Sequence, residues 1–147
     1  MYRRILVPTD GSTLSGKAVA HAIGLAKSLG ARITALYVAA PYPRPVYVDS
    51  VVDDPAARSE YASIAEREAQ HVLGPVQRKA AVAKVTCDVV HTTGDAPWEA
   101  ILDAARAHKS DVIVMASHGR RGVAALLLGS ETQKVLTHAR IPVVVVR

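Results

Sequence analysis

A glycine and hydroxyl pattern in the last third of the chain contains the residue types that bind phosphate groups. The segment Ala116–Gly119 follows a short apolar run, and Gly129 comes nine residues later, next to Ser130 and a segment of helical period. Glycine lets the backbone approach phosphate oxygens or adopt positive φ, and the amino end of a helix presents free N–H groups to an anion. We therefore expect the Ser130 hydroxyl and the amides of Glu131 and Thr132 to face phosphates.

This spacing is similar to the signature of the universal stress protein family, G-2x-G-9x-G-[S/T]. Gly119 stands at the second glycine, Gly129 at the third and Ser130 at the hydroxyl, while Ala116 replaces the first glycine. The resemblance covers the whole chain, from the segment at 5–12 to the segment at 141–146. It implies the UspA type of this family and its ATP-binding subgroup.

The resemblance also implies a ligand and its contacts. The ligand is ATP, with ADP or AMP as alternatives, and Mg²⁺ accompanies the nucleotide. Asp10 would lie near the ribose and phosphates and touch the metal, the Val38 backbone would bind the adenine edge, and Met115 would pack beside the base. The implied nucleotide-binding residues are Pro8, Thr9, Asp10, Val38, Met115, Ala116, His118, Gly119, Gly129, Ser130, Glu131 and Thr132.

Two positions depart from the family pattern. Ala116 adds a methyl group near the ligand, which is tolerable if its φ is negative. Glu131 stands where the family usually has an apolar residue, so a carboxylate lies in the first turn of the helix that should receive phosphates. That charge suits the helix dipole but repels a triphosphate unless the side chain turns outward, which favours a shorter nucleotide.

Structural roles are the alternative for the same residues. Gly119 and Gly129 would then only permit turns, Ser130 would be an N-cap, and Asp10 would cap a helix or bond to turn backbone. No catalytic residue is assigned, because the sequence shows no Ser, Cys or carboxylate partner for His118. Arg120 and Arg121 are expected to add long-range attraction for an anion.

A P-loop is a competing interpretation of an earlier segment. The residues from Gly11 to Lys17 fit the first seven places of that pattern and follow an apolar strand. The eighth place is Ala18, which lacks the hydroxyl that holds magnesium, and the run from Val112 to Ala116 ends without an acidic residue. We therefore favour a plain helix here, with Ser12 as its N-cap and Lys17 facing solvent.

The elements that position these residues alternate between strand and helix. Short apolar runs predict buried parallel strands at 5–7, 33–38, 85–91, 112–116 and 143–146. Four helices are predicted: one between Ser12 and Gly30, one that starts at Asp54 and Pro55, one that starts at Asp95 and Pro97, and one at 130–138. The second is expected to bury one face, made of Tyr61, Ile64, Ala65, Ala69, Val72 and Leu73. The same helix is expected to kink or end at Gly74 and Pro75.

This alternation predicts an α/β fold, a doubly wound parallel sheet with helices on both faces. The family resemblance adds five strands in the order 3-2-1-4-5 and a Rossmann-like site at the carboxyl ends of the strands, similar to the adenine nucleotide alpha hydrolases. The proline-rich stretch 40–53 is expected to be an exposed loop that serves as a lid.

The composition limits the classes of protein that fit. A chain of 147 residues with 50% hydrophobic content predicts one domain over 1–147, with no membrane span and no secretory signal, and therefore a cytoplasmic protein. Cys87 is the single cysteine, which excludes an internal disulfide. The net charge of +5 favours anionic partners, but scattered basic residues and six aromatics argue against nucleic acid.

The expected function is a regulatory or signalling nucleotide-binding protein of the stress response, with an unknown protein partner. The apolar run at 143–146 predicts a sheet edge that is covered, and the resemblance implies a homodimer through Val143 to Val146, although a tetramer is equally allowed. A slow ATPase or a phosphate- or adenylate-transferring enzyme is the first alternative. A nucleotide-free dimeric interaction module is the second.

Overall fold

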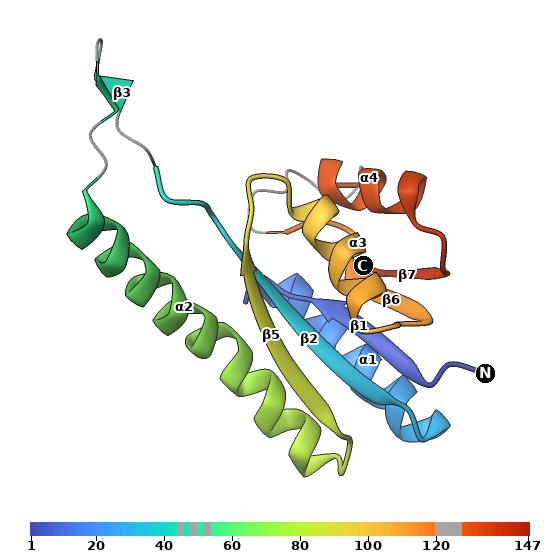
Figure 1. The fold of residues 1–147 in the computed structure, drawn as a ribbon. Helices are drawn as coiled ribbons and strands as arrows, with labels where there is room; N and C mark the ends of the chain where they lie inside the picture. Colours follow the sequence, from blue (N-terminus) through green and yellow to red (C-terminus); the bar gives the residue numbers. More distant parts are fainter. Residues whose placement is uncertain (44–45, 48–49, 52–53, 120–127) are drawn as a thin grey trace.

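The computed structural model describes residues 1–43, 46–47, 50–51, 54–119 and 128–147. A five-stranded parallel sheet forms its centre, with the strand order β5-β2-β1-β6-β7 (Figure 1). Counted along the chain, these strands have the order 3-2-1-4-5, which confirms the expected topology. The elements are β1 (Arg4–Pro8), α1 (Thr13–Leu29), β2 (Arg32–Ala39), β3 (Val46–Tyr47), β4 (Ser50–Val51), α2 (Pro55–Val82), β5 (Cys87–Thr93), α3 (Pro97–Ala107), β6 (Val112–Ala116), α4 (Ser130–His138) and β7 (Val143–Val146).

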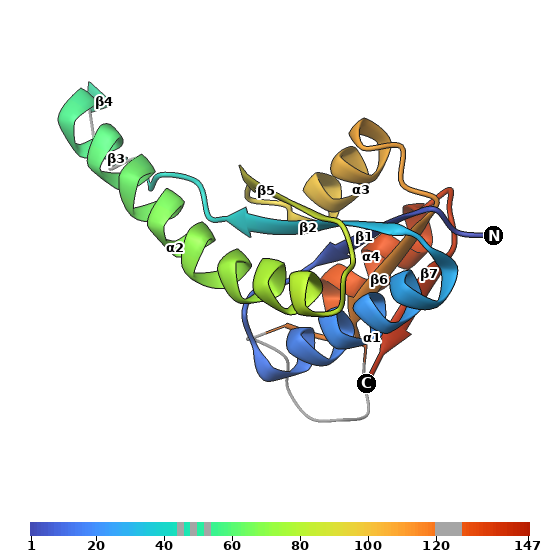
Figure 2. The same ribbon diagram turned by 90° about the horizontal axis from the view of Figure 1, so that it is seen from below.

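Helices cover both faces of the sheet, with α1 and α2 on one face and α3 and α4 on the other (Figure 2). Alternate strand residues divide the core, because successive side chains of a strand point to opposite faces. Ile5 and Val7 of β1 pack in the cluster under α1 and α2, whereas Leu6 packs with Ile101 of α3 and Val135 of α4. The sheet is therefore doubly wound, as the sequence predicts.

The first helix begins and ends where the sequence predicts. The Ser12 side chain accepts a hydrogen bond from the Ser15 N–H at 3.2 Å. Gly30 ends the helix with φ 63°, a left-handed conformation that glycine adopts without steric cost. Gly16 and Lys17 lie within this helix, so the residues from Gly11 to Lys17 do not form a P-loop.

The second long helix corrects two predictions. It begins as expected, with the Asp54 side chain accepting from the backbone of the first turn and Pro55 as the first helical residue. It does not end at Gly74 and Pro75 but continues to Val82 with the proline inside it. The face predicted to be buried from Tyr61 onward is buried only from Ala69, because only the second half of the helix lies over the sheet (Figure 1). Ile64, which was expected to point inward, is 46% exposed.

Two other boundaries differ by one or two residues from the prediction. The strand expected from Val85 begins at Cys87, although Val85 is buried. The third helix has Ala96, and not Asp95, as its N-cap, and no side chain caps it from that position. In the stretch 40–53, Val46–Tyr47 pairs with Ser50–Val51 in an antiparallel ladder, and the expected lid otherwise falls on 44–45, 48–49 and 52–53, outside the described residues.

Among the helices described, none has the length and apolarity needed to cross a membrane.

Candidate functional site

The candidate site lies at the edge of the sheet where β1, β2 and β6 end. β1 pairs with β2 on one side and with β6 on the other, and all three strands are parallel, so their carboxyl ends meet at this edge. The chain order of the strands reverses at β1, which is the place where doubly wound sheets bind ligands. The predicted residues Pro8, Thr9, Val38, Met115 and Ala116 all lie in or directly after these strand ends.

The turn after β1 is fixed by its own side chains. The Thr9 N–H donates to the Leu36 carbonyl at 2.9 Å, and the buried Thr9 and Ser15 hydroxyls share a hydrogen bond of 2.9 Å. The Ser12 N–H donates to Asp10 Oδ1 at 2.9 Å. One Asp10 oxygen therefore has the turn-stabilising role that we considered as an alternative to ligand binding, and it holds the carboxylate in one place.

The second Asp10 oxygen lies against the loop after β6. A Cβ placed on Gly119 would be 2.6 Å from Asp10 Oδ2, closer than real Cβ contacts allow. The φ of Gly119 is outside the left-handed range. The sequence analysis offered close approach or a turn as the reason for this glycine, and the structure supports close approach, to the Asp10 carboxylate.

Gly129 connects α4 to the same loop. Its N–H donates to the Ser117 carbonyl at 2.8 Å, and a Cβ on it would be 3.1 Å from His118 Cβ. The buried Thr132 hydroxyl donates to the Ala116 carbonyl at 3.1 Å. These contacts place the amino end of α4 beside the end of β6.

The amino end of α4 has no side-chain cap within the described residues. Its N-cap is Gly129, which has φ −61° and ψ 151°, and the helix begins at Ser130. Ser130 is exposed and is the first helical residue, so the interpretation of Ser130 as an N-cap is wrong. The first intrahelical bond runs from the Gln133 N–H to the Gly129 carbonyl, so the amides of residues 130–132 precede the hydrogen-bonded ladder. Such an end is suited to an anion.

The Glu131 side chain, in the first turn of α4, is held by a neighbouring helix. Its Oε2 accepts a hydrogen bond from the Trp98 N–H of α3 at 2.8 Å, and its Oε1 lies 3.3 Å from Lys134 Nζ. The sequence analysis expected this carboxylate to repel a triphosphate unless its side chain turns outward. The structure fixes it against the start of α3, within the first turn of α4. The contact joins residues 33 positions apart, so sequence periodicity could not reveal it.

The residues expected near the base have different surroundings. Val38 is half-buried and packs against the core cluster under α3 and α4. Met115 is a buried member of the same cluster, with 5% exposure. Both residues therefore contact the hydrophobic core near the strand ends, and Met115 offers little surface to a ligand.

A cavity of about 300 Å³ lies beside the loop after β6. It is lined by Thr13, Leu14, Lys17, Ser117, His118 and Arg147. The His118 ring is within hydrogen-bond distance of its neighbour, with Nδ1 3.1 Å from Ser117 Oγ. The sequence analysis missed Ser15, Ser117 and Arg147. Ser15 bonds to its near neighbours Thr9 and Ser12, whereas Ser117 is placed by contacts with the distant residues Gly129 and Val146. Arg120 and Arg121 lie outside the described residues.

Among the described residues at these strand ends, Asp10 is the carboxylate expected to lie near a metal. Among the residues that the structure describes, no group of three or more His, Cys, Asp or Glu side chains is placed to hold a metal ion. A metal held by Asp10 would therefore need its other ligands from the nucleotide or water. This arrangement fits the expected form, in which Mg²⁺ accompanies the nucleotide.

The fold is that of an α/β protein whose candidate site lies at the switch point of a doubly wound sheet. The sequence matches the universal stress protein family over residues 1–147, and the chain belongs to this family. A universal stress protein of Methanocaldococcus jannaschii is 34% identical over 149 residues, a match that covers 100% of this chain and 83% of the relative.

Solved structures agree with this assignment. The universal stress protein UspA from Lactobacillus plantarum superposes with a TM-score of 0.81 at 28% identity, covering 99% of this chain and 98% of that one. A universal stress protein in complex with cAMP superposes with a TM-score of 0.72 at 25% identity, covering 99% and 97%. More distant members of the fold, from Arabidopsis thaliana and Archaeoglobus fulgidus, hold AMP and dAMP at 20% and 16% identity.

Proposed function

We propose that this chain binds an adenine nucleotide at the ends of β1, β2 and β6 and acts as a regulatory protein of the stress response. The observation that carries the proposal is the amino end of α4. No described side chain caps it, and the bond from the Gly129 N–H to the Ser117 carbonyl holds it beside β6. The binding of cAMP by a structural neighbour of the same family supports an adenine nucleotide.

The proposed ligand is ATP with Mg²⁺, and ADP and AMP are the alternatives. Phosphates would face Ser130 and the first amides of α4, with Asp10 and Gly119 forming the side of the site nearest β1. The adenine edge would contact the backbone at Val38. When bound, Mg²⁺ would neutralise phosphate charge, and Asp10 would be the residue of this chain nearest to it.

The test is calorimetric titration of nucleotide-stripped protein with ATP, ADP and AMP in the presence of magnesium. Gly129→Val crowds His118 and the Ser117 carbonyl, so we expect it to abolish binding. Lys17→Ala, a substitution within α1, should retain micromolar affinity. Absence of binding by the wild type would favour the nucleotide-free interaction module, and phosphate release by the same samples would identify a slow ATPase.

A homodimer through β7 is part of this proposal. The four valines of β7 are each half-buried at the edge of the sheet. The Pro142 carbonyl accepts from the Ile113 N–H of β6 at 3.0 Å, and the Val146 carbonyl accepts from the Ser117 N–H, directly after β6, at 2.8 Å. Backbone directions alternate along a strand. The backbone groups of Val143 and Val145 therefore point to the open edge, where an antiparallel copy of β7 would pair with them.

We further propose a cytoplasmic location and a single domain over 1–147. Nucleotide occupancy would change the surface that the protein offers to a partner. Fractionation of cells that express the chain, followed by detection in the soluble cytoplasmic fraction, tests the location. Cooperative unfolding in one transition by two spectroscopic probes tests the single domain.

A further inference from the structure

Helix α3 begins with one backbone donor that its own sequence does not satisfy. Pro97, the first helical residue, has no N–H, and the Glu99 and Ala100 amides donate to the Ala96 carbonyl at 3.1 Å and 3.3 Å. Ala96 has no side chain able to cap the helix. The Trp98 N–H is therefore the donor that needs an acceptor from elsewhere.

Glu131 supplies that acceptor from the neighbouring helix. Its Oε2 accepts the Trp98 N–H at 2.8 Å, and a ring contact of 4.7 Å between Trp98 and His138 lies on the same pair of helices. Glu131 therefore performs for α3 the role of an N-cap side chain, although it belongs to another helix. The negative charge also suits the positive end of the α3 dipole, and this double contact fixes where the carboxylate lies.

The same carboxylate belongs to the first turn of the proposed phosphate-binding helix. Glu131 follows Ser130 directly and precedes Thr132, so its charge lies within one helical turn of the amides that would face phosphates. Lys134 offsets this charge from one side only, at 3.3 Å and with both side chains partly exposed. A fixed negative charge at that place weakens the binding of each further negative charge on the ligand.

We propose that Glu131 sets the nucleotide preference of this site by lowering its affinity for ATP relative to AMP. The inference rests on the proposed nucleotide site and adds a specificity-determining residue to it. Glu131 acts through its charge and not through contact with the base or ribose. Its effect is largest for the ligand with the highest phosphate charge, which is ATP without magnesium.

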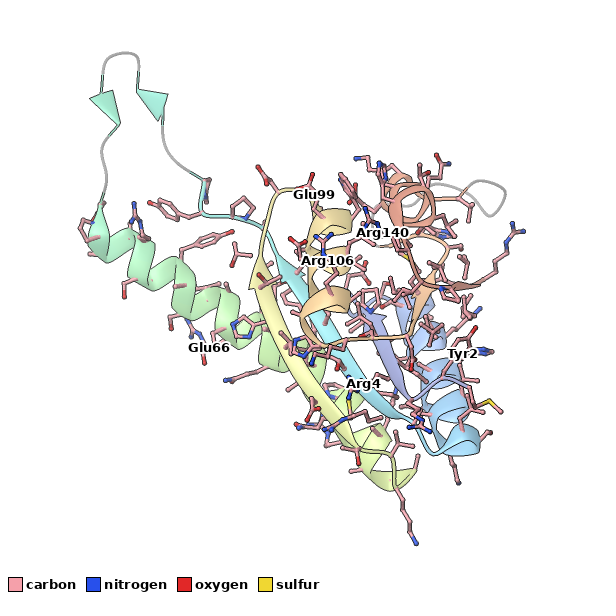
Figure 3. All side chains as sticks on the ribbon, turned by 45° about the vertical axis from the view of Figure 1, so that its right-hand side comes forward. Tyr2, Arg4, Glu66, Glu99, Arg106 and Arg140 are labelled. Carbon is pink, nitrogen blue, oxygen red and sulfur yellow. The ribbon has the colours of Figure 1, made fainter. Side chains whose placement is uncertain are left out.

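The experiment compares Glu131→Gln with the wild type. Glutamine keeps a side-chain oxygen that can accept the Trp98 N–H, so the cap of α3 is preserved while the charge is removed. The matched control is Glu99→Gln, because Glu99 is an exposed acidic residue in the first turn of α3, next to Trp98 (Figure 3). Both variants change the net charge equally and lie close to the same helix end.

Nucleotide-stripped proteins are titrated with AMP and ATP, each with and without magnesium, and circular dichroism checks that both variants are folded. We expect Glu131→Gln to raise the affinity for ATP relative to AMP by about two- to five-fold without magnesium, and by less with it. Glu99→Gln should leave the ratio unchanged. An unchanged ratio in Glu131→Gln, or an equal change in both variants, would overturn the inference.

The two proposals fail in different ways in this experiment. If the wild type and both variants bind AMP and ATP but the ratio does not move, the nucleotide site stands and the role of Glu131 does not. If none of the proteins binds either nucleotide, the proposed function is wrong and the inference with it. A larger shift at low salt than at high salt supports the electrostatic origin, since exposed charges are screened by ions.

Discussion

The Asp10 carboxylate and Gly119 touch across the site, so that a Cβ on residue 119 would lie 2.6 Å from Asp10 Oδ2. The contact brings the turn after β1 against the loop after β6, although the two residues are far apart in the sequence. Asp10 Oδ1 is already bonded to the Ser12 N–H at 2.9 Å, so the carboxylate has little freedom to move. A side chain at residue 119 would therefore require Asp10 or the loop to shift.

Gly119→Ala should therefore weaken nucleotide binding. The added methyl group displaces either Asp10 or the loop from the position proposed for binding. We expect the affinity to fall by roughly five- to a hundred-fold, which corresponds to about 1–3 kcal/mol. Calorimetric titration with AMP or ATP measures the loss.

Gly24→Ala is the matched control for this substitution. Gly24 lies inside α1, and a Cβ there meets nothing within 4 Å. We expect unchanged nucleotide affinity and a gain in unfolding free energy of roughly 0.5–1 kcal/mol, because alanine is the better helix former. Equal affinities for Gly119→Ala and the wild type would contradict the proposed site geometry.

The fold was predictable because its signals are local. The apolar β-branched runs became the five strands of the sheet, and Ser12 and Gly30 bound α1 as expected. The helix does not end at Pro75, one of the two outcomes predicted there, because α2 packs along the sheet through that point, with Leu73 and Val76 both buried. This packing outweighs the helix-breaking tendency of proline.

The candidate site was only partly predictable from sequence. The spacing of Gly119 and Gly129 indicated a phosphate-binding loop, but it could not show that each glycine is needed for a close approach to a different segment. The direction of the Glu131 side chain depends on an unsatisfied amide in α3, a helix built from another part of the chain. Contacts of this kind, between segments far apart in the chain, leave no periodic pattern in the sequence that could predict them.

Thr132→Val should lower the stability of the fold. The buried Thr132 hydroxyl donates to the Ala116 carbonyl at 3.1 Å, and valine has the same shape without the donor. We expect the unfolding free energy to fall by about 1 kcal/mol, measured by urea denaturation. Thr132→Ser keeps the donor and should not lose this contribution, although the missing methyl group has its own packing cost. A valine variant as stable as the wild type would show that the bond contributes nothing net.

Val145→Pro tests the proposed dimer. The Val145 N–H points to the open edge of β7, so proline removes a donor that only a partner strand would use, and edge positions tolerate proline. We expect the wild type to sediment as a dimer at micromolar concentration and the variant as a monomer with the same far-ultraviolet spectrum. Val82→Ala changes a valine far from β7, 86% exposed at the end of α2, and should leave the dimer intact. A monomeric wild type would rule out pairing through β7.

Cys87 makes the stability of the fold depend on pH in the alkaline range. Burial at the start of β5 raises the pKa of the Cys87 thiol above its ordinary value of 9.0, and the neighbouring Asp88 charge raises it further. Above that ordinary value the thiol ionises in the unfolded chain but stays protonated in the folded one, so the folded state binds more protons and unfolding becomes easier as the pH rises. The difference in unfolding free energy between the wild type and Cys87→Ala should therefore shift against the wild type between pH 8 and pH 10.

Asp88→Asn should lower the pKa of the Cys87 thiol and speed its reaction with a disulfide reagent in the folded protein, since the thiolate is the reacting form. If the unfolding free energy of the wild type rose relative to that of Cys87→Ala as the pH increased, the assignment of a raised thiol pKa would be contradicted.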